Sequence, residues 1–205
     1  MERIYLILIF IATSGLAFGQ TFESNLTEHN LFEYQEIKKA PLEMSAGNVI
    51  ARFLDGLIYR YYWATEGLKS TDLAYRPSKE ARSSIETITH IQDLSFVIAN
   101  AAYGKPNKGT DHYEESKFAE ARLLTLQNLS AASQRFSSMP EDSLRSIELI
   151  FHSETGEQKL PIWNLMNGPI NDAVYHVGQI VSFRRTTGNP IVPGLSMMRG
   201  TAPKN

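Results

Sequence analysis

Residues 161–188 read PIWNLMNGPINDAVYHVGQIVSFRRTTG and carry the clearest helical signal in the chain. Apolar side chains recur there at spacings of three and four, as expected for one buried face of an α-helix. They are Ile162, Leu165, Met166, Ile170, Ala173, Val177, Ile180 and Val181. Pro161 suits a helix start, whereas Pro169 is expected to kink or restart the helix because it lacks an amide hydrogen.

Three upstream stretches show the same period. The first covers about residues 42–68, and the second begins near Ser78, where Glu80 and Glu86 suit a helix N-terminus, and fades after residue 100. The third covers about residues 113–137 and ends before Pro140. Four long helices without alternating strands predict an all-α fold, a four-helix bundle.

A short β-hairpin is expected before the last helix. Residues 144–151 alternate imperfectly between apolar and polar side chains, and residues 154–157 (ETGE) suit a turn. Residues 104–109 (GKPNKG) predict a loop because of their glycines and proline. The bundle domain is therefore placed at residues 41–188, between a polar leader at 20–40 and an extended tail at 189–205.

Residues 1–19 have the layout of a signal peptide. An early arginine precedes an apolar run at residues 4–12, and small residues precede Gln20. A permanent anchor needs about 20 uninterrupted apolar residues, and the run is broken at Thr13. We therefore expect an exported protein, periplasmic or secreted, without a stable membrane anchor after cleavage.

Composition narrows the class of protein further. The chain has 205 residues, 42% of them hydrophobic, which suits one globular domain. Its 20 basic and 22 acidic residues give a net charge of -2, so nucleic acid is not an expected partner. Cysteine is absent, so the fold contains no disulfide bond and no thiol can act as nucleophile or ligand.

Asp172 and His176 are four residues apart, so on a helix both project from one face and can bind the same ion. Such a pair is more often a surface charge contact. Here it lies beside the apolar face of the last helix, where an unpaired carboxylate would be costly. His90, at the margin of the apolar face of the second predicted helix, is a further candidate, and a hydrogen-bonded polar network is the alternative.

The segment Thr89-His-Ile-Gln-Asp-Leu94, after Tyr75-Arg-Pro77, and the segment running from His176-Val-Gly-Gln-Ile180 to Arg184-Arg-Thr-Thr-Gly188 resemble the DinB-like superfamily. The resemblance covers about residues 51–188. It implies a four-helix bundle whose second helix supplies one histidine and whose last helix supplies a His-x-x-x-His pair before Gly-Gln.

On this resemblance the metal ligands are His90, Asp172 and His176, with Asp172 where the family usually has histidine. Two imidazoles and a carboxylate suit Zn, Ni, Mn or Fe, so the ligand types leave the divalent ion unidentified. Three protein ligands leave coordination positions for water, which makes hydrolysis the simplest chemistry. Gln179 is a candidate catalytic residue that would bond this water or the substrate, and its alternative role is a helix-packing amide.

Three functions are weighed. The first is an exported metal-dependent hydrolase acting on an unknown small-molecule substrate, and the second is a non-catalytic exported binding protein with a structural or vestigial metal site. The resemblance also includes thiol-dependent S-transferases, but export would separate the chain from the cellular thiol pool. The oligomeric state is open, with a homodimer as one option.

Five other side chains are weaker candidates for a functional role. Tyr62, Trp63 and Glu66 could line the metal cavity, although aromatic residues on such a helix are more often core. Arg184 and Arg185 could bind an anion, but in the last turn of a helix arginines more often complement its dipole.

Overall fold

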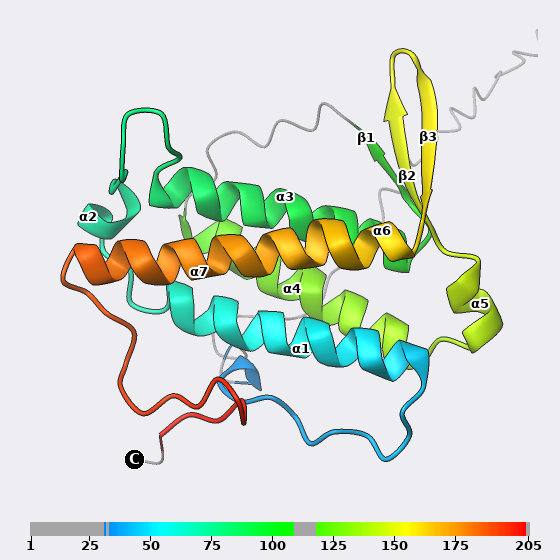
Figure 1. Ribbon diagram of the computed structural model, residues 1–205, viewed down its shortest axis with the longest axis horizontal. Coiled ribbons are helices and arrows are strands. Elements are labelled where there is room, and N and C mark those ends of the chain that lie inside the picture. The colour runs from blue at the N-terminus through cyan, green and yellow to red at the C-terminus, as the bar shows by residue number, and fades with distance from the viewer. Residues whose placement is uncertain (1–30, 32, 109–117, 204–205) are drawn as a thin grey trace, which may run out of the picture.

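The protein was analysed as a computed structural model, which describes residues 31, 33–108 and 118–203. Four long helices form the body of the molecule (Figure 1): α1 (Ala46–Thr65), α3 (Ser84–Ala102), α4 (Phe118–Ser137) and α7 (Asn171–Thr186). Helices α1 and α3 each pack against both α4 and α7. The predicted four-helix bundle is confirmed, whereas the predicted signal peptide lies outside the described residues.

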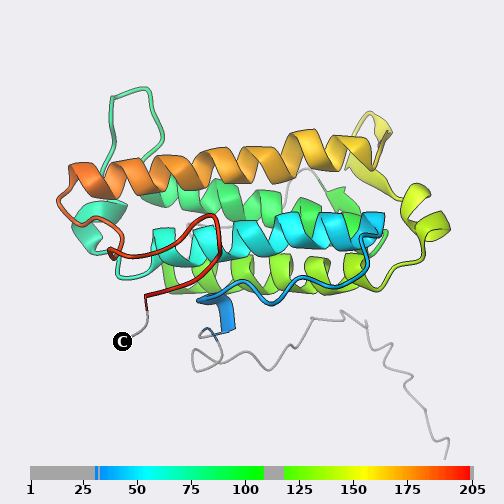
Figure 2. The ribbon, with the colours of Figure 1, turned by 60° about the horizontal axis from the view of Figure 1, so that its bottom comes forward.

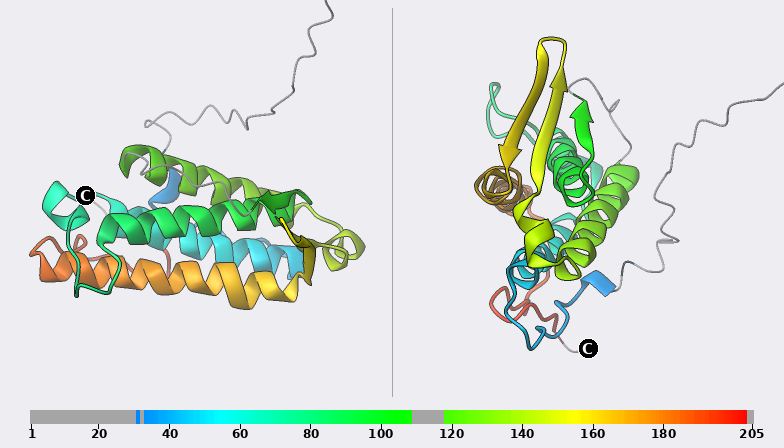
Figure 3. Two further views of the ribbon diagram at one scale, coloured as in Figure 1. Left: turned by 90° about the horizontal axis from the view of Figure 1, so that it is seen from above. Right: turned by 90° about the vertical axis from the view of Figure 1, so that its right-hand side faces the viewer.

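The bundle core consists of the apolar faces that the sequence period predicted. Views along and across the helices show the four packed around one centre (Figure 3). The largest fully buried apolar side chains at this centre come from α1, α3, α4 and the segment before α7: Leu54, Leu57, Ile88, Ile91, Ile98, Leu126, Leu129, Phe136 and Leu165. Helices α1 and α4 approach closely at Gly47, where an added Cβ would lie 2.3 Å from the backbone oxygen of Phe136.

Helix α3 begins later than predicted. Ser83 is its N-cap, and Ser83 and Glu86 form a capping box in which each side chain accepts from the backbone N–H of the other. The prediction of a start near Ser78 is wrong, because residues 77–81 form turns and bends. The amide of Ser84 donates to the Tyr75 carbonyl at 2.9 Å, which holds the end of this loop.

The predicted hairpin is present, with shifted bounds. Strands β2 (Glu148–Ser153) and β3 (Gly156–Pro161) pair antiparallel and project from the bundle (Figure 1). The start at residue 144 was wrong, because Leu144 is buried in a short helix, α5 (Glu141–Arg145). Strand β1 (Pro106–Lys108) was predicted as loop and pairs parallel to β2, and the polar connection after α1 contains the short helix α2 (Ser70–Leu73).

The interruption predicted at Pro169, within the last predicted helix, is confirmed. A short α6 (Trp163–Leu165) runs into a π-helical turn, η2 (Met166–Ile170). Gly168 in that turn has φ -97° and ψ -105°, outside the helical region, and α7 restarts at Asn171. Pro169 cannot supply the amide hydrogen that a continuous helix would need. The break sets the direction of α7 immediately before Asp172.

The leader and the tail cross the outer face of α1 side by side (Figure 2). The amide of Ile37 donates to the Gly200 carbonyl at 2.8 Å, and the hydroxyl of Tyr59 donates to the Thr201 carbonyl at 2.9 Å. Gly200 has φ +67°, and an added Cβ would lie 2.4 Å from the Ile37 side chain, so glycine is required there. Within the described residues, no helix is both long and apolar enough to cross a membrane.

Candidate metal centre

Two neighbouring helices bring the three predicted ligands together. His90 lies in the second turn of α3, and Asp172 and His176 lie in the first two turns of α7. One possible ligand atom from each residue lies within 4.8 Å of the others. The Oδ2 atom of Asp172 is 3.3 Å from Nε2 of His90, and its Oδ1 atom is 3.3 Å from Nε2 of His176.

The three candidate ligands differ in how far their side chains are exposed to solvent. The side chain of His176 is 9% exposed, that of His90 is 26% exposed and that of Asp172 is 44% exposed. The two imidazole rings meet edge to face, with centroids 4.8 Å apart. The carboxylate therefore lies on the solvent side of the pair, where a small molecule could reach it.

Gln179 fixes the ring of His176. Its Oε1 atom is 2.7 Å from Nδ1 of His176, one turn along α7. An amide oxygen only accepts hydrogen bonds, so Nδ1 of His176 carries a proton, and Nε2 is the nitrogen left to bind a metal ion. Nε2 faces Oδ1 of Asp172, which is an acceptor. A proton or a metal ion between Nε2 and Oδ1 would satisfy both atoms.

His90 is electrically suited to bind a metal ion. Burial is the main reason that the pKa of His90 lies below its ordinary value of 6.5, and the positive charge of Arg82 lowers this pKa further. The hydrogen bond to Asp172 acts in the opposite direction without reversing the shift. The ring is therefore neutral at pH 7, which is the form that coordinates metals.

The residues present fit a divalent ion. Two neutral imidazoles and one ionised carboxylate are ordinary ligands for zinc and for the other late first-row metals. The charged contacts of Asp172 within the described chain are with the two histidines, and no lysine or arginine pairs with this carboxylate there. A metal ion held by these three side chains would neutralise the carboxylate.

Arg184 has a structural role that the sequence did not indicate. Its side chain is 4% exposed, and one of its terminal nitrogens donates to the carbonyls of Trp63, Ala64 and Glu66 at 2.9–3.1 Å. Its Nε and other terminal nitrogen donate to Asn189. The anion-binding interpretation of Arg184 is wrong, since the guanidinium is occupied by the carbonyls at the C-terminus of α1.

The α1 residues considered for the metal cavity make other contacts. The guanidinium of Arg122 lies 4.8 Å from the centre of the Tyr62 ring and pairs with Glu66 at 2.5 Å. The indole nitrogen of Trp63 donates to the Gln35 carbonyl at 3.2 Å. These contacts assign the three residues to the end of α1 and its junctions with α4 and the leader.

Structural comparison identifies the fold. The chain matches the crystal structure of a DinB-like protein, YjoA, from Bacillus subtilis, with a TM-score of 0.50 and 15% sequence identity. The match covers 69% of this chain and 96% of the other chain. No family model and no curated protein matches the sequence. The chain thus has the DinB-like fold that its motifs predicted. A structural match at 15% identity shows the fold and not an activity.

Proposed function

We propose that this protein binds one divalent metal ion through His90 Nε2, Asp172 and His176 Nε2. The observation that carries the proposal is the convergence of three possible ligands, with His176 Nε2 facing Asp172 Oδ1 at 3.3 Å. Because Gln179 accepts from Nδ1, Nε2 is turned toward the carboxylate, where both atoms can bind one ion. His90 completes a three-ligand set from the neighbouring helix.

We further propose that the protein is a metal-dependent hydrolase of small molecules. A divalent ion with three protein ligands supplies Lewis acidity at its remaining coordination positions. The exposed carboxylate of Asp172 leaves the site accessible, and the lowered pKa of His90 favours the neutral ring that binds metals. Gln179 would act as a positioning residue for His176.

Metal binding is tested by elemental analysis of the mature protein purified without a chelating tag. We expect one divalent ion per chain in the wild type, and strongly reduced metal in His90→Ala, Asp172→Ala and His176→Ala. His152→Ala is the matched control, because His152 lies on the hairpin and pairs with Glu157 at 2.6 Å. A wild type that rejects added Zn, Ni, Mn and Fe would end the proposal.

Catalysis is tested separately with the metal-loaded protein. A panel of p-nitrophenyl esters and phosphates should be hydrolysed by the wild type and by His152→Ala, and not by the metal-depleted variants. Activity that persists in Asp172→Ala after its metal is lost would show that hydrolysis does not depend on this centre.

A non-catalytic binding protein is the second candidate. It is favoured by the position of the cavity described below, which is lined by residues other than His90, Asp172 and His176. A metal-loaded protein without hydrolytic activity on the panel, whose metal exchanges slowly and raises the melting temperature, would support a structural ion instead.

Export is proposed from the amino-terminal pattern of residues 1–19. Expression of the full chain in a bacterium, followed by fractionation and mass spectrometry, should give a mature chain that begins near Gln20 in the periplasm or medium. An uncleaved chain in the cytoplasm would contradict this proposal and would leave the metal centre unaffected.

A further inference from the structure

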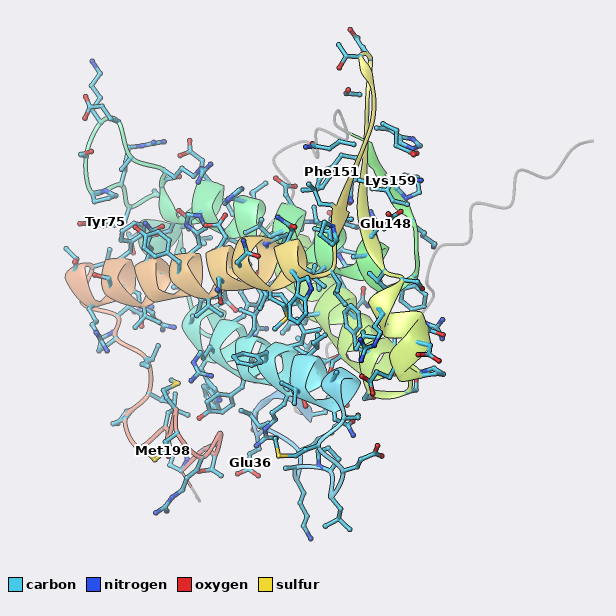
Figure 4. The ribbon with its side chains drawn as sticks, turned by 45° about the vertical axis from the view of Figure 1, so that its right-hand side comes forward. Glu36, Tyr75, Glu148, Phe151, Lys159 and Met198 are labelled. Atoms are coloured by element: carbon cyan, nitrogen blue, oxygen red, sulfur yellow. The ribbon has the colours of Figure 1, made fainter. Side chains whose placement is uncertain are left out.

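A second site lies on the outer face of α1, and none of the three metal ligands lines it. It is a cavity of about 580 Å³ between α1, the start of α7, the leader and the tail. This volume is typical of cavities that hold small molecules, which range over roughly 300–1,000 Å³. Figure 4 shows the tail, with Met198 labelled, below α1, far from the hairpin residues Phe151 and Lys159.

The cavity gathers exposed apolar side chains. Of the eight large apolar side chains that the described residues expose, four line it: Met44, Phe53, Val174 and Met198. Phe53 is 56% exposed and Met198 is 97% exposed, and the buried Leu57 also lines the cavity. Methionine side chains adapt to different apolar shapes. Such a concentration on one surface indicates a binding site.

Two arginines give the cavity a positive wall. Arg52 and Arg60 lie eight residues apart on α1, and Glu43 is the single acidic residue of the lining. Arg52 donates to the Lys38 carbonyl, and Arg60 donates to the carbonyls of Gly56 and Met197. Within the described residues neither guanidinium forms an ion pair, and each has five N–H donors. Donors therefore remain for an oxyanion.

The leader and the tail close the cavity together. Ile37 and Met197 both line it, and the leader is joined to the tail by the hydrogen bond from Ile37 to Gly200. The required glycine at position 200 lets the two segments touch. The cavity wall thus depends on a contact that can be altered without touching the arginines or Phe53.

We infer that this cavity binds a small amphipathic anion, with an apolar chain against Phe53, Val174 and the methionines and an oxyanion end at Arg52 and Arg60. Apolar burial supplies the affinity, and the guanidiniums select the charged end because Arg pairs with carboxylate and phosphate alike. None of the three metal ligands lines the cavity, so we expect the anion to bind independently of the metal ion.

Isothermal titration of the full mature chain with decanoate, decyl phosphate and decanol, below their micelle concentrations and in the presence of EDTA, tests the inference. We expect one-to-one binding of decanoate, decyl phosphate or both, at least tenfold tighter than decanol, because a charge-assisted hydrogen bond contributes about tenfold or more. Decanol binding as tightly as the anions, or the absence of saturable binding by all three, would overturn it.

Variants locate the site. Arg52→Gln and Arg60→Gln should each weaken anion binding about tenfold and leave decanol binding unchanged. Phe53→Ala should weaken all ligands, whereas Trp163→Ala, which removes an exposed aromatic outside the cavity, should weaken none. Gly200→Val should weaken binding while circular dichroism remains native. Equal effects of Phe53→Ala and Trp163→Ala would contradict the assignment.

Asp172→Ala separates this site from the metal centre. We expect decanoate binding to be unchanged in this variant. Loss of binding in Asp172→Ala, with wild-type stability, would place the anion elsewhere and would overturn the inference without bearing on metal binding.

Discussion

The chemistry of the metal centre depends on which nitrogen of His176 carries a proton. Gln179 settles this by accepting from Nδ1 at 2.7 Å, so that Nε2 faces Asp172 and the neighbouring helix. The hydrogen bond joins residues three apart on α7, so the helix itself holds the ring in place. The hydrogen bond from His176 to Gln179 therefore orients the ligand nitrogen in the absence of a metal ion.

Replacing Gln179 by Leu should lower metal affinity about 10- to 100-fold, since partners that orient a ligating histidine commonly contribute that much. Competition with a chromophoric chelator measures the affinity. Gln179→Glu is the matched control, because it keeps an acceptor for Nδ1 and should bind metal at least as well as the Leu variant does. An unchanged affinity in Gln179→Leu would show that packing alone orients the ring.

The three ligands were predicted from the sequence for different reasons. Helical spacing was enough to place Asp172 and His176 on one face. His90 is 82 residues away from Asp172 in the chain, so the resemblance to DinB-like proteins was needed to bring it to the pair. The role of Gln179 could not be predicted, because spacing gives its proximity to His176 but not the direction of its amide.

At the scale of single elements, the N-terminus of α3 is held by charge. Glu86 accepts from the backbone N–H of Ser83 at 2.7 Å and from Arg76 at 2.6 Å. The hydrogen bond from Arg76, followed by that from Ser83, lowers the pKa of Glu86 from 4.5 to about 2. The carboxylate is ionised in the folded protein well below the pH at which it is protonated in the unfolded chain.

This shift predicts the pH dependence of stability. The stabilising effect of Glu86 is complete above pH 4.5 and is lost as the pH falls from 4.5 toward 2, because the unfolded chain binds the proton more tightly. Urea unfolding at pH 7, 4 and 3 should show that Glu86→Gln differs from the wild type most at pH 7. Side-chain NMR titration should give a pKa near 2 for Glu86, and a pKa near 4.5 would contradict this prediction.

Two helical glycines form a matched pair for testing helix packing. Gly47→Ala should destabilise the protein by about 1–3 kcal/mol, because its Cβ would collide with the backbone of α4 at Phe136. Gly178→Ala should stabilise it by about 0.5–1 kcal/mol, since its Cβ would meet nothing within 4 Å and alanine favours helix. Urea denaturation measures both, and equal effects of the same sign would refute the close approach of α1 and α4.

The C-terminus of α1 is completed by a side chain from another helix. Arg184 donates to three carbonyls at that end, where a helix leaves carbonyls without partners in its own backbone. Asp72 lies in the same group, joined to Asn189 at 2.6 Å and to Thr187. Burial opposes the ionisation of Asp72, but hydrogen bonds from Thr187, Lys69 and Asn189 and the charge of Arg184 leave its pKa below the ordinary value.

Arg184→Gln should therefore reduce the free energy of unfolding by about 3 kcal/mol, because buried carbonyls and Asp72 would lose their cationic partner. Arg185→Gln is the control, since Arg185 is exposed and should have an effect within about 0.5 kcal/mol. Chemical denaturation at pH 7 compares the two variants. A difference below about 1 kcal/mol would mean that water replaces the guanidinium easily.

At the scale of the whole molecule, the leader and the tail are joined although they belong to opposite ends of the domain. Gly200→Val should separate them and increase hydrogen exchange at the Ile37 amide about tenfold or more, because the donor would lose its carbonyl partner. Amides at the centre of α3 should keep their protection. Arg199→Ala, a change to an exposed neighbouring side chain, should leave the Ile37 amide protected.

The overall architecture could be predicted because each long helix carries its own apolar period. Features that depend on distant partners could not be predicted. Strand β1 is three residues long and forms only because it pairs with β2. Arg184 donates hydrogen bonds to carbonyls more than a hundred residues earlier in the chain. The start of α3 was misplaced because Ser78 and Ser83 both suit an N-cap. The contacts of Tyr75 and Arg76 that select Ser83 are tertiary.

The placement of His90 and Asp172 on different helices has a further consequence for folding. A metal ion bound to both would close a loop spanning 82 positions of a chain that contains no cysteine. It would act as a reversible cross-link of the folded chain, and at a free concentration one hundred times the Kd it would add about 2.7 kcal/mol of stability. The melting temperature would then rise with metal supply, and the yield of folded protein would follow the availability of the ion.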